Sequence, residues 1–188
     1  MLKIDNKRLI EKTNNHFGKI DILYLNAGIA PPTPVTDISE AHYNDIFNIN
    51  VKGPIFTVKE ALPYMNDGGS ILFTTSIVNQ KGFDGFGVYS ASKGALRSYA
   101  RVLTTEVKSR KIRVNSIAPG PIETPIYGKM GLPQDVLDGL GESFGQQIPL
   151  GRFGSSEEIA NTALFLASDD ASFVNGIEIE VDGGMSQI

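Results

Sequence analysis

The 188-residue sequence predicts an α/β fold built on a parallel β-sheet with helices on both faces. Nearly continuous apolar runs are typical of strands buried on both faces, and they occupy residues 20–25, 70–75, 112–118 and 177–181. Segments with helical periodicity separate these runs, and such alternation indicates a parallel sheet. Ligands of these sheets bind beyond the carboxyl ends of the strands, so we expect the functional residues there.

The composition fits one domain that spans residues 1–188. Hydrophobic residues make up 41% of the chain, charged residues make up 20%, and the net charge is -4. This charge favours neither nucleic acid nor an anionic membrane as a partner. The absence of cysteine excludes disulfides and thiolate metal sites, and the two histidines are not paired, so no metal site is expected. The N-terminal residues carry no signal-peptide core, which predicts a cytoplasmic protein.

The first half of the chain is expected to form a helix, a strand, a second helix, a turn and a second strand, over residues 5–17, 20–25, 39–65, 66–69 and 70–75. Asp37 and Glu40 have the spacing of a capping box, which predicts where the second helix begins. Gly53 and Pro54 lie inside that helix and predict a kink or an adjustment of its hydrogen bonding.

The second half is expected to form a glycine-rich loop, a helix, a strand, an irregular segment with short helical pieces, a helix and a last strand, over residues 82–87, 87–110, 112–118, 121–154, 155–167 and 177–181. Ser155 and Glu158 have capping-box spacing at the start of the last helix. Long segments without regular structure inside compact domains are often functional. We therefore interpret residues 121–154 as a substrate lid.

Tyr89 and Lys93 lie four residues apart in the expected helix, so their side chains should share one face. Two unit charges about 4 Å apart interact by roughly 4 kcal/mol at the effective dielectric of a protein surface. This interaction can lower the pKa of a tyrosine from about 10 by up to roughly three units. A phenol that titrates near neutrality can act as a general acid/base. Because lone Tyr-x-x-x-Lys pairs are common by chance, the interpretation depends on the surrounding residues.

Two more polar residues are candidates for the same site. Ser76 ends a buried strand, where its hydroxyl can hold a substrate oxygen against the Tyr89 phenol. Asn50 lies inside a helix, where asparagine competes for backbone hydrogen bonds. It can therefore mark a distortion that anchors a water next to Lys93. Taken singly, each residue is explained as well by an ordinary strand-end hydroxyl or a solvated polar position.

Taken together, these residues resemble the short-chain dehydrogenase/reductase family over essentially the whole chain. Leu25 departs from the family's Asn-Asn-Ala-Gly by standing in the place of its first Asn. The motifs that carry the resemblance follow the family's order and spacing, which makes the set specific. They are Asn26-Ala27-Gly28, Asn50, Ser76, Tyr89-Ser90-Ala91-Ser92-Lys93, Asn115, Pro119-Gly120-Pro121-Ile122-Glu123-Thr124 and Asp182-Gly183-Gly184.

The resemblance implies hydride transfer between the nicotinamide of NAD or NADP and a small alcohol or ketone. It implies that Tyr89 is the general acid/base and that Lys93 both lowers the pKa of Tyr89 and binds the ribose. Ser76 would orient the substrate, and Asn50 would hold a relay water. Further cofactor contacts are implied for Asn26, Ala27 and Gly28 on the adenosine side, and for Pro119, Gly120, Ile122 and Thr124 beside the nicotinamide.

The sequence departs from the family at the phosphate site. Its 188 residues contain no Gly-x-x-x-Gly-x-Gly turn, the element that brings backbone and a helix N-terminus to a pyrophosphate. We therefore expect a Rossmann-like fold that lacks its first βαβαβ half, weak cofactor binding, and an exposed edge at the strand 20–25. The glycines of residues 82–87 do not match that turn, because position 90 is Ser90, and we interpret them as a flexible active-site loop.

Two other interpretations have some support in the sequence. Ser90 and Lys93 also form a Ser-x-x-Lys pair, the acyl-enzyme motif of β-lactamases, but the Ser-Asp-Asn and Lys-Thr-Gly partners of that motif are absent. The stronger alternative is a truncated, catalytically inactive relative of the dehydrogenases that serves only as an oligomerising or binding protein. The resemblance also implies a homo-oligomer, a dimer or tetramer, formed through the helices at 39–65 and 86–110.

Overall fold

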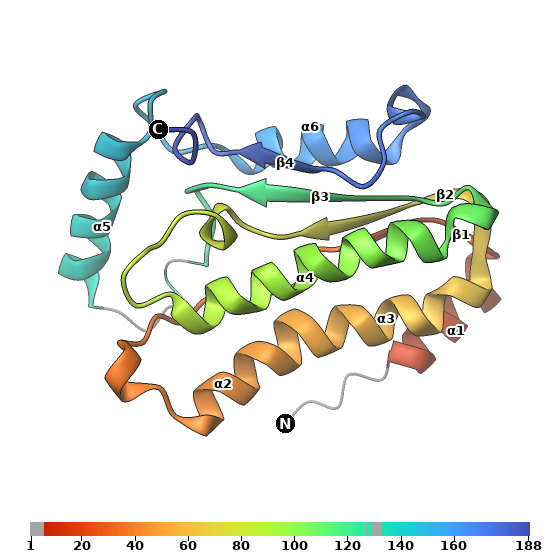
Figure 1. The fold of residues 1–188 in the computed structure, drawn as a ribbon, viewed down its shortest axis with the longest axis horizontal. Helices are drawn as coiled ribbons and strands as arrows, with labels where there is room; N and C mark the ends of the chain where they lie inside the picture. Colours follow the sequence, from red (N-terminus) through yellow and green to blue (C-terminus); the bar gives the residue numbers. More distant parts are fainter. Residues whose placement is uncertain (1–5, 127, 129–132) are drawn as a thin grey trace.

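The computed structural model describes residues 6–126, 128 and 133–188. At its centre is a four-stranded parallel sheet in the order β1-β2-β3-β4. The strands are β1 (Ile20–Leu25), β2 (Met65–Thr74), β3 (Arg113–Pro119) and β4 (Glu178–Val181). Because all four run in one direction, their carboxyl ends lie at the same end of the molecule (Figure 1). The predicted Rossmann-like parallel sheet is confirmed.

Helices cover both faces of the sheet (Figure 1). One face carries α2 (Glu40–Phe47), α3 (Gly53–Ala61) and α4 (Gly87–Glu106), with α1 (Asn6–Phe17) against α3, and the other face carries α6 (Ser156–Ala167). The remaining helix, α5 (Gln134–Gln147), stands at the end to which the strands point (Figure 1). In the described part of the chain, each helix is too short or too polar to cross a membrane.

The helix predicted after Asp37 begins later and ends earlier than expected. Its N-cap is Ser39, whose Oγ accepts a hydrogen bond of 3.1 Å from the His42 N–H. Asp37 belongs instead to a separate 3-10 turn, so its capping-box spacing with Glu40 was coincidental. The last α-helical residue is Ala61, after which the chain tightens into another 3-10 turn.

The expected adjustment in this helix is a π-helical turn, Asn48–Lys52, placed just before Gly53 and Pro54. In this turn the Gly53 N–H bonds the Asn48 carbonyl, five residues back instead of four. A proline ring crowds the carbonyl four residues before it, and the wider turn accommodates Pro54 without ending the helix. The π-turn therefore lies at Asn50, one of the predicted site residues.

Two further predictions about local structure were wrong. Residues 66–69 are not a turn but the start of β2, where the pairing with β1 shifts register. Gly69 permits this close approach, because a Cβ there would lie 2.8 Å from the Asp21 carbonyl oxygen. The segment 121–154 contains the 14-residue helix α5 where only short helical pieces were expected. Glycine lowers helix propensity, and the glycines inside α5 concealed it in the sequence.

The capping box predicted for α6 is present. The Glu158 N–H donates to Ser155 Oγ at 3.3 Å, and the Ser155 N–H donates to Glu158 Oε2 at 2.7 Å. Both residues thus satisfy backbone donors that the first turn of the helix leaves free. α4, by contrast, ends at Glu106 rather than near residue 110, and a 3-10 turn follows it.

The core has two layers because side chains alternate along the buried strands. In β2, Ile71 and Phe73 belong to the cluster on the α4 side, where they join Leu96. Leu72 points to the other face and belongs to the cluster that contains Leu166 of α6. The continuous apolar run of β2 is thus required by burial on both faces.

β1 is the least covered strand. It pairs with β2 on one side, and within the described ranges no other strand pairs with it. The α6 cluster takes its members from β2, β3 and β4, so α6 leaves β1 uncovered. Ile22 is consequently 52% exposed and Tyr24 36% exposed. The strand at 20–25 therefore has the exposed edge that the sequence predicted.

Leu166 should contribute strongly to the stability of this arrangement. Its side chain is 0% exposed between α6 and the sheet, so Leu166→Ala removes buried methyl groups and leaves a cavity. We expect a loss of about 2–5 kcal/mol in the free energy of unfolding, measured by urea denaturation. Leu164→Ala, on the same helix at 69% exposure, is the matched control and should cost much less. Equal losses for the two variants would contradict the packing of α6.

Candidate active site

A cleft of about 600 Å³ opens at the carboxyl ends of the strands. It gathers the segments that follow β1, β2 and β3, the start of α4, and residues of α5 and α6. Among its described lining residues, Lys93 is the single charged group. All the predicted site residues except Asn50 line the cleft, namely Asn26, Ala27, Gly28, Ser76, Tyr89, Lys93, Pro119, Gly120, Ile122 and Thr124.

Tyr89 points its phenol into the cleft from the first turn of α4, next to Ser76. Burial raises the pKa of Tyr89 above its usual value, and the hydrogen bond with the Ser76 side chain lowers that pKa only in part. Phe86 contributes to this apolar environment, with its ring centroid 6.1 Å from that of Tyr89. The expected lowering of the tyrosine pKa toward neutrality was wrong, because desolvation of the phenolate outweighs the hydrogen bond.

Lys93 is 3% exposed and lies behind the tyrosine ring. Its Nζ donates a hydrogen bond of 2.7 Å to the Thr74 carbonyl at the end of β2 and lies 5.7 Å from the ring centroid of Tyr89. Burial lowers the pKa of Lys93 to about 8. At pH 7 the side chain is therefore mostly an ammonium ion held next to the tyrosine.

Asn50 is fully buried behind the cleft, and the π-turn presents its side chain to two other segments. Its side chain forms two hydrogen bonds with the backbone of Ile29, each of 2.9 Å. Asn50 Oδ1 accepts from the Ile29 N–H, and Asn50 Nδ2 donates to the Ile29 carbonyl. It also donates to Ser92 Oγ at 3.1 Å, and that hydroxyl donates to the Tyr89 carbonyl at 2.7 Å. Asn50 thus joins the loop after β1 to the turn of α4 that carries Tyr89.

Glycines allow close backbone approach at both sides of the cleft. A Cβ on Gly28 would lie 3.3 Å from both Asn50 Oδ1 and Lys93 Nζ. A Cβ on Gly120 would lie 2.6 Å from the Cβ of Asp182, closer than real contacts allow. The Asp182 carboxylate meanwhile accepts hydrogen bonds from the backbone of the turn that follows β4. These two positions therefore require glycine for packing.

The predicted lid segment is tied together at its two ends. Ile122 and Gly154 form an isolated parallel bridge, in which the Glu123 N–H donates to the Gly154 carbonyl at 2.9 Å. Between these ends, α5 brings Phe144 to the cleft, where its ring meets Phe83 edge to face at a centroid distance of 5.9 Å. Residues 127 and 129–132 of the segment lie outside the described residues.

The sequence matches known proteins along most of its length. The family model described as enoyl-(acyl carrier protein) reductase matches residues 3–186. A 3-oxoacyl-(acyl-carrier-protein) reductase of Thermotoga maritima is 39% identical over 181 residues, which is 95% of this chain and 71% of that protein. A probable tetrahydroxynaphthalene reductase of Zymoseptoria tritici is 33% identical over 186 residues, which is 94% of this chain and 68% of that protein.

Solved structures are similar as well. A short-chain dehydrogenase/reductase from Brucella melitensis has a TM-score of 0.89 at 35% identity, over 96% of this chain and 71% of that one. The crystal structure of levodione reductase has a TM-score of 0.91 at 32% identity, over 97% of this chain and 72% of that one. The chain belongs to the short-chain dehydrogenase/reductase family.

In this short-chain dehydrogenase/reductase, several residues that shape the cleft were missed in the sequence. Thr74 acts through its backbone carbonyl, which no side-chain pattern can mark. Ser92 was quoted only as part of a motif, although it links Asn50 to α4. Phe144 lies in α5, where only short helical pieces were expected. Asp182 was recognised as part of a closing motif, but its contact with Gly120 follows only from the fold.

The lowered pKa of Lys93 predicts a pH-dependent contribution to folding. The pKa is about 8 in the folded chain and 10.5 for an ordinary lysine, so the unfolded chain holds this proton more tightly. The full free-energy cost of burying the Lys93 ammonium is therefore present below about pH 8. This cost decreases as the pH rises toward 10.5. Relative to Lys93→Met, the unfolding free energy of the wild type should rise by about 2 kcal/mol between roughly pH 7 and pH 9.5.

Urea denaturation of both proteins at the two pH values measures this difference. Lys59→Met is the control, because the Lys59 side chain is 68% exposed and should show no comparable rise. A Lys93 difference that stays flat over the same range would contradict the lowered pKa.

Proposed function

We propose that this protein is an NAD(P)-dependent oxidoreductase that transfers a hydride between the nicotinamide and an alcohol or ketone. The observation that carries the proposal is the convergence of Ser76, Tyr89 and Lys93 on one cleft at the strand ends. They place a hydroxyl, a phenol and an ammonium within a single small volume. The names of two relatives, a 3-oxoacyl-(acyl-carrier-protein) reductase and a probable tetrahydroxynaphthalene reductase, support chemistry at a carbonyl group.

Each of the three side chains has a distinct role in this proposal. Tyr89 gives a proton to the substrate oxygen when a ketone is reduced and takes it back when an alcohol is oxidised. Its raised pKa keeps the phenol protonated at pH 7, which suits the donor in ketone reduction. Ser76, already hydrogen-bonded to the phenol, holds the substrate oxygen beside it. Lys93 favours the phenolate that forms, because its positive charge lies behind the ring.

The donors in the cleft fit the nicotinamide riboside part of the proposed cofactor. The Lys93 ammonium and the Tyr89 phenol suit the ribose hydroxyls, and Gly28 keeps the approach open, since a Cβ there would crowd Lys93 Nζ. We place the adenosine side at Asn26 and Ala27. The nicotinamide would be flanked by Pro119, Gly120, Ile122 and Thr124. When bound, the cofactor supplies or accepts the hydride.

Cofactor binding by the 188 residues is proposed to be weak. The sequence holds no Gly-x-x-x-Gly-x-Gly turn, and a pyrophosphate depends on the backbone N–H groups of such a turn. The donors described above engage the nicotinamide end alone. We therefore expect NADH and NADPH to require millimolar concentrations for saturation.

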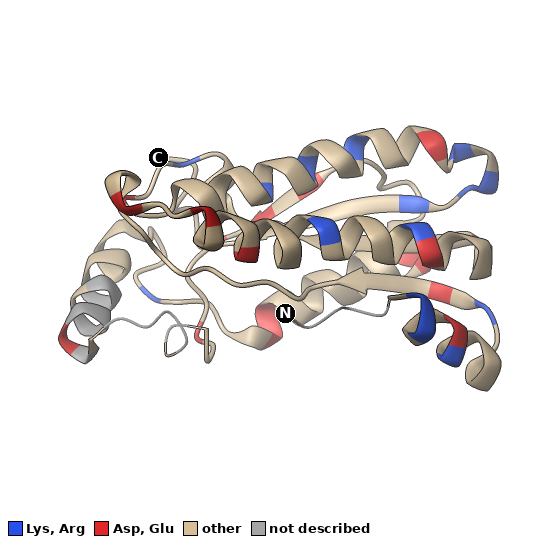
Figure 2. Ribbon diagram, turned by 90° about the horizontal axis from the view of Figure 1, so that it is seen from below, with Lys and Arg blue, Asp and Glu red and all other residues tan. Residues whose placement is uncertain are grey.

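The proposed substrates are neutral and largely apolar. Apart from Lys93, the described lining carries no charge, and it includes the rings of Phe83, Phe86 and Phe144. Most Lys and Arg residues lie at the end of the molecule opposite α5 (Figure 2). Cyclic ketones or alcohols fit such a cleft better than anions, and we propose that residues 121–154 close over them as a lid.

Tyr89→Phe should remove turnover while leaving the fold intact. Loss of a positioned acid/base typically costs about 10²–10⁴ in rate. The measurement is oxidation of NADH and NADPH, at millimolar concentration, with a panel of cyclic and aliphatic ketones. Tyr99→Phe is the matched control, because Tyr99 lies on the same helix but packs against Phe73 in the core.

Each outcome of this experiment decides between the two candidate functions. Turnover by the wild type that survives in Tyr89→Phe would reject the assignment of Tyr89. Binding of cofactor by a folded wild type without turnover on any substrate would favour the inactive, binding or oligomerising alternative. Submicromolar binding of either cofactor by the 188 residues would reject the proposal that the phosphate site is incomplete.

We further propose a homo-oligomer, a dimer or tetramer, formed through α2, α3 and α4. Many apolar residues of these helices, among them Ile46, Leu96 and Leu103, lie in the core of the chain and are not available to an interface. Phe56 and Val102 remain available, at 45% and 53% exposure on α3 and α4. Exposed apolar side chains on neighbouring helices favour burial against another copy.

Light scattering should give a dimer or tetramer for the wild type at micromolar concentration. Phe56→Glu places a charge at the proposed interface and should shift the mass toward the monomer. Val35→Glu, at an 83% exposed position outside these helices, is the control and should leave the mass unchanged. A monomeric wild type across the micromolar range would reject the interface.

A further inference from the structure

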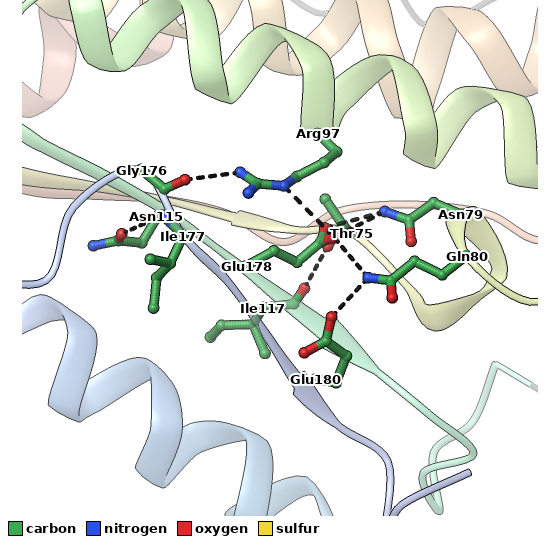
Figure 3. A network of polar contacts seen from close by, with 10 residues as sticks. All are labelled: Thr75, Asn79, Gln80, Arg97, Asn115, Ile117, Gly176, Ile177, Glu178 and Glu180. Atoms are coloured by element: carbon green, nitrogen blue, oxygen red, sulfur yellow. Dashed lines mark hydrogen bonds and ion pairs between the residues drawn. The ribbon is translucent and has the colours of Figure 1, made fainter. Parts of the chain in front are cut away.

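The carboxylate of Glu178 lies at the centre of a partly buried polar network on the α4 side of β4 (Figure 3). Its side chain is only 5% exposed. Asn79 Nδ2 donates to its two oxygens at 3.1 and 3.2 Å, and Gln80 Nε2 donates to Oε2 at 3.1 Å. Arg97 Nε forms an ion pair with Oε2 at 3.6 Å. One carboxylate of β4 therefore contacts two other segments of the chain, the turn after β2 and the helix α4.

One of these segments is the helix that carries the proposed acid/base. Arg97 lies four residues after Lys93 and eight after Tyr89, so the three side chains share one face of α4. The Arg97 side chain is 14% exposed, and its Nη1 also donates to the Gly176 carbonyl at 3.1 Å, just before β4. Arg97 thus joins the face of α4 that holds the site to the last strand.

The other segment carries the proposed substrate-orienting hydroxyl. Ser76 is the N-cap of the 3-10 turn Ile77–Asn79, and the Asn79 N–H donates to the Ser76 carbonyl at 3.2 Å. The side chains of Asn79 and Gln80, at the end of that turn, both reach Glu178. Glu178 of β4 therefore holds the turn that Ser76 caps, in addition to α4.

We propose that Glu178 is a positioning residue that fixes the distance between the Ser76 hydroxyl and the Tyr89 phenol by holding both segments to β4. Apolar packing brings α4 and the turn together but is non-directional. The hydrogen bonds from Asn79 and Gln80 to the carboxylate fix the turn in direction and distance, and the ion pair with Arg97 holds α4 to the same carboxylate. The bond between hydroxyl and phenol needs such control, because it weakens steeply with misalignment. The effect on turnover rests on the proposed function; the effect on the Ser76–Tyr89 bond does not.

Glu178→Gln tests the proposal, and Glu180→Gln is its matched control. Glu180 lies two residues further along the same strand and accepts from Gln80 at 2.6 Å, whereas the ion pair of Arg97 is with Glu178. Both substitutions remove one negative charge from the same face of β4. Only Glu178→Gln removes the carboxylate that joins Arg97 of α4 to the turn that begins at Ser76.

The first readout is the ionisation of Tyr89, which requires no turnover. Tyrosine labelled with carbon-13 at Cζ is titrated by NMR, and Tyr89→Phe assigns the signal. The groups next to the phenol are Ser76 and Lys93 of α4, and the further charges of the network are Arg97, Glu178 and Glu180. Losing the bond from Ser76 raises the pKa of Tyr89, whereas losing a nearby negative charge alone lowers it.

The direction of the shift therefore separates geometry from charge. We expect the Tyr89 midpoint to rise in Glu178→Gln by about half a unit or more, and to stay level or fall in Glu180→Gln. If the protein turns over ketones, kcat should fall about tenfold or more in Glu178→Gln with little change in the KM for the cofactor. A Tyr89 midpoint that does not rise in Glu178→Gln would overturn the proposal, whether or not the protein is an active enzyme.

A second variant covers the case in which Glu178→Gln fails to fold because the Arg97 charge is left buried and unpaired. The double variant Arg97→Met with Glu178→Gln removes both charges and breaks the same link. It should fold and show the same rise in the Tyr89 midpoint. A folded double variant with a wild-type midpoint would also overturn the proposal.

Discussion

The position of α4 against the sheet is the constraint on which the site depends. This helix carries both Tyr89 and Lys93, and the Lys93 ammonium is buried against the Thr74 carbonyl at the end of β2. Leu96 and Leu103 press the helix onto the sheet, but apolar contacts do not fix its position along its axis. The hydrogen bond from Lys93 does so, since a buried ammonium is strongly destabilised without an acceptor.

Two further polar contacts hold α4 on either side of that bond. Asn50 reaches Ser92 from the π-turn, and Glu178 reaches Arg97 from β4. The site is therefore assembled from irregular as well as regular structure. π-turns are rare and often occur at functional sites, and this one gives Asn50 access to both Ile29 and Ser92. A regular helix would present a different face at this position.

The electrostatics of the site differ from what the Tyr-x-x-x-Lys spacing alone suggests. Helical spacing placed the two side chains correctly on one face, but burial governs their titration. Desolvation raises the pKa of Tyr89 and lowers that of Lys93 to about 8. Both shifts disfavour the charged form, as expected in an apolar cleft with few neighbouring charges. The pKa values of a free tyrosine and a free lysine lie close together, and in this site they move apart.

The sequence by itself determined the parallel sheet, its cover of helices and most of the polar residues that line the cleft. β2 and β3 are buried on both faces, and such strands require continuous apolar runs. Because the strands are parallel, Ser76, Tyr89 and Gly120 lie at the same end of the sheet. The tertiary structure alone decided the pKa shifts, the role of the Thr74 carbonyl, and the network around Glu178. These depend on desolvation and on contacts between residues up to about a hundred positions apart, as between Asn79 and Glu178. Local patterns record which face of an element is buried, but not which partner lies across from it.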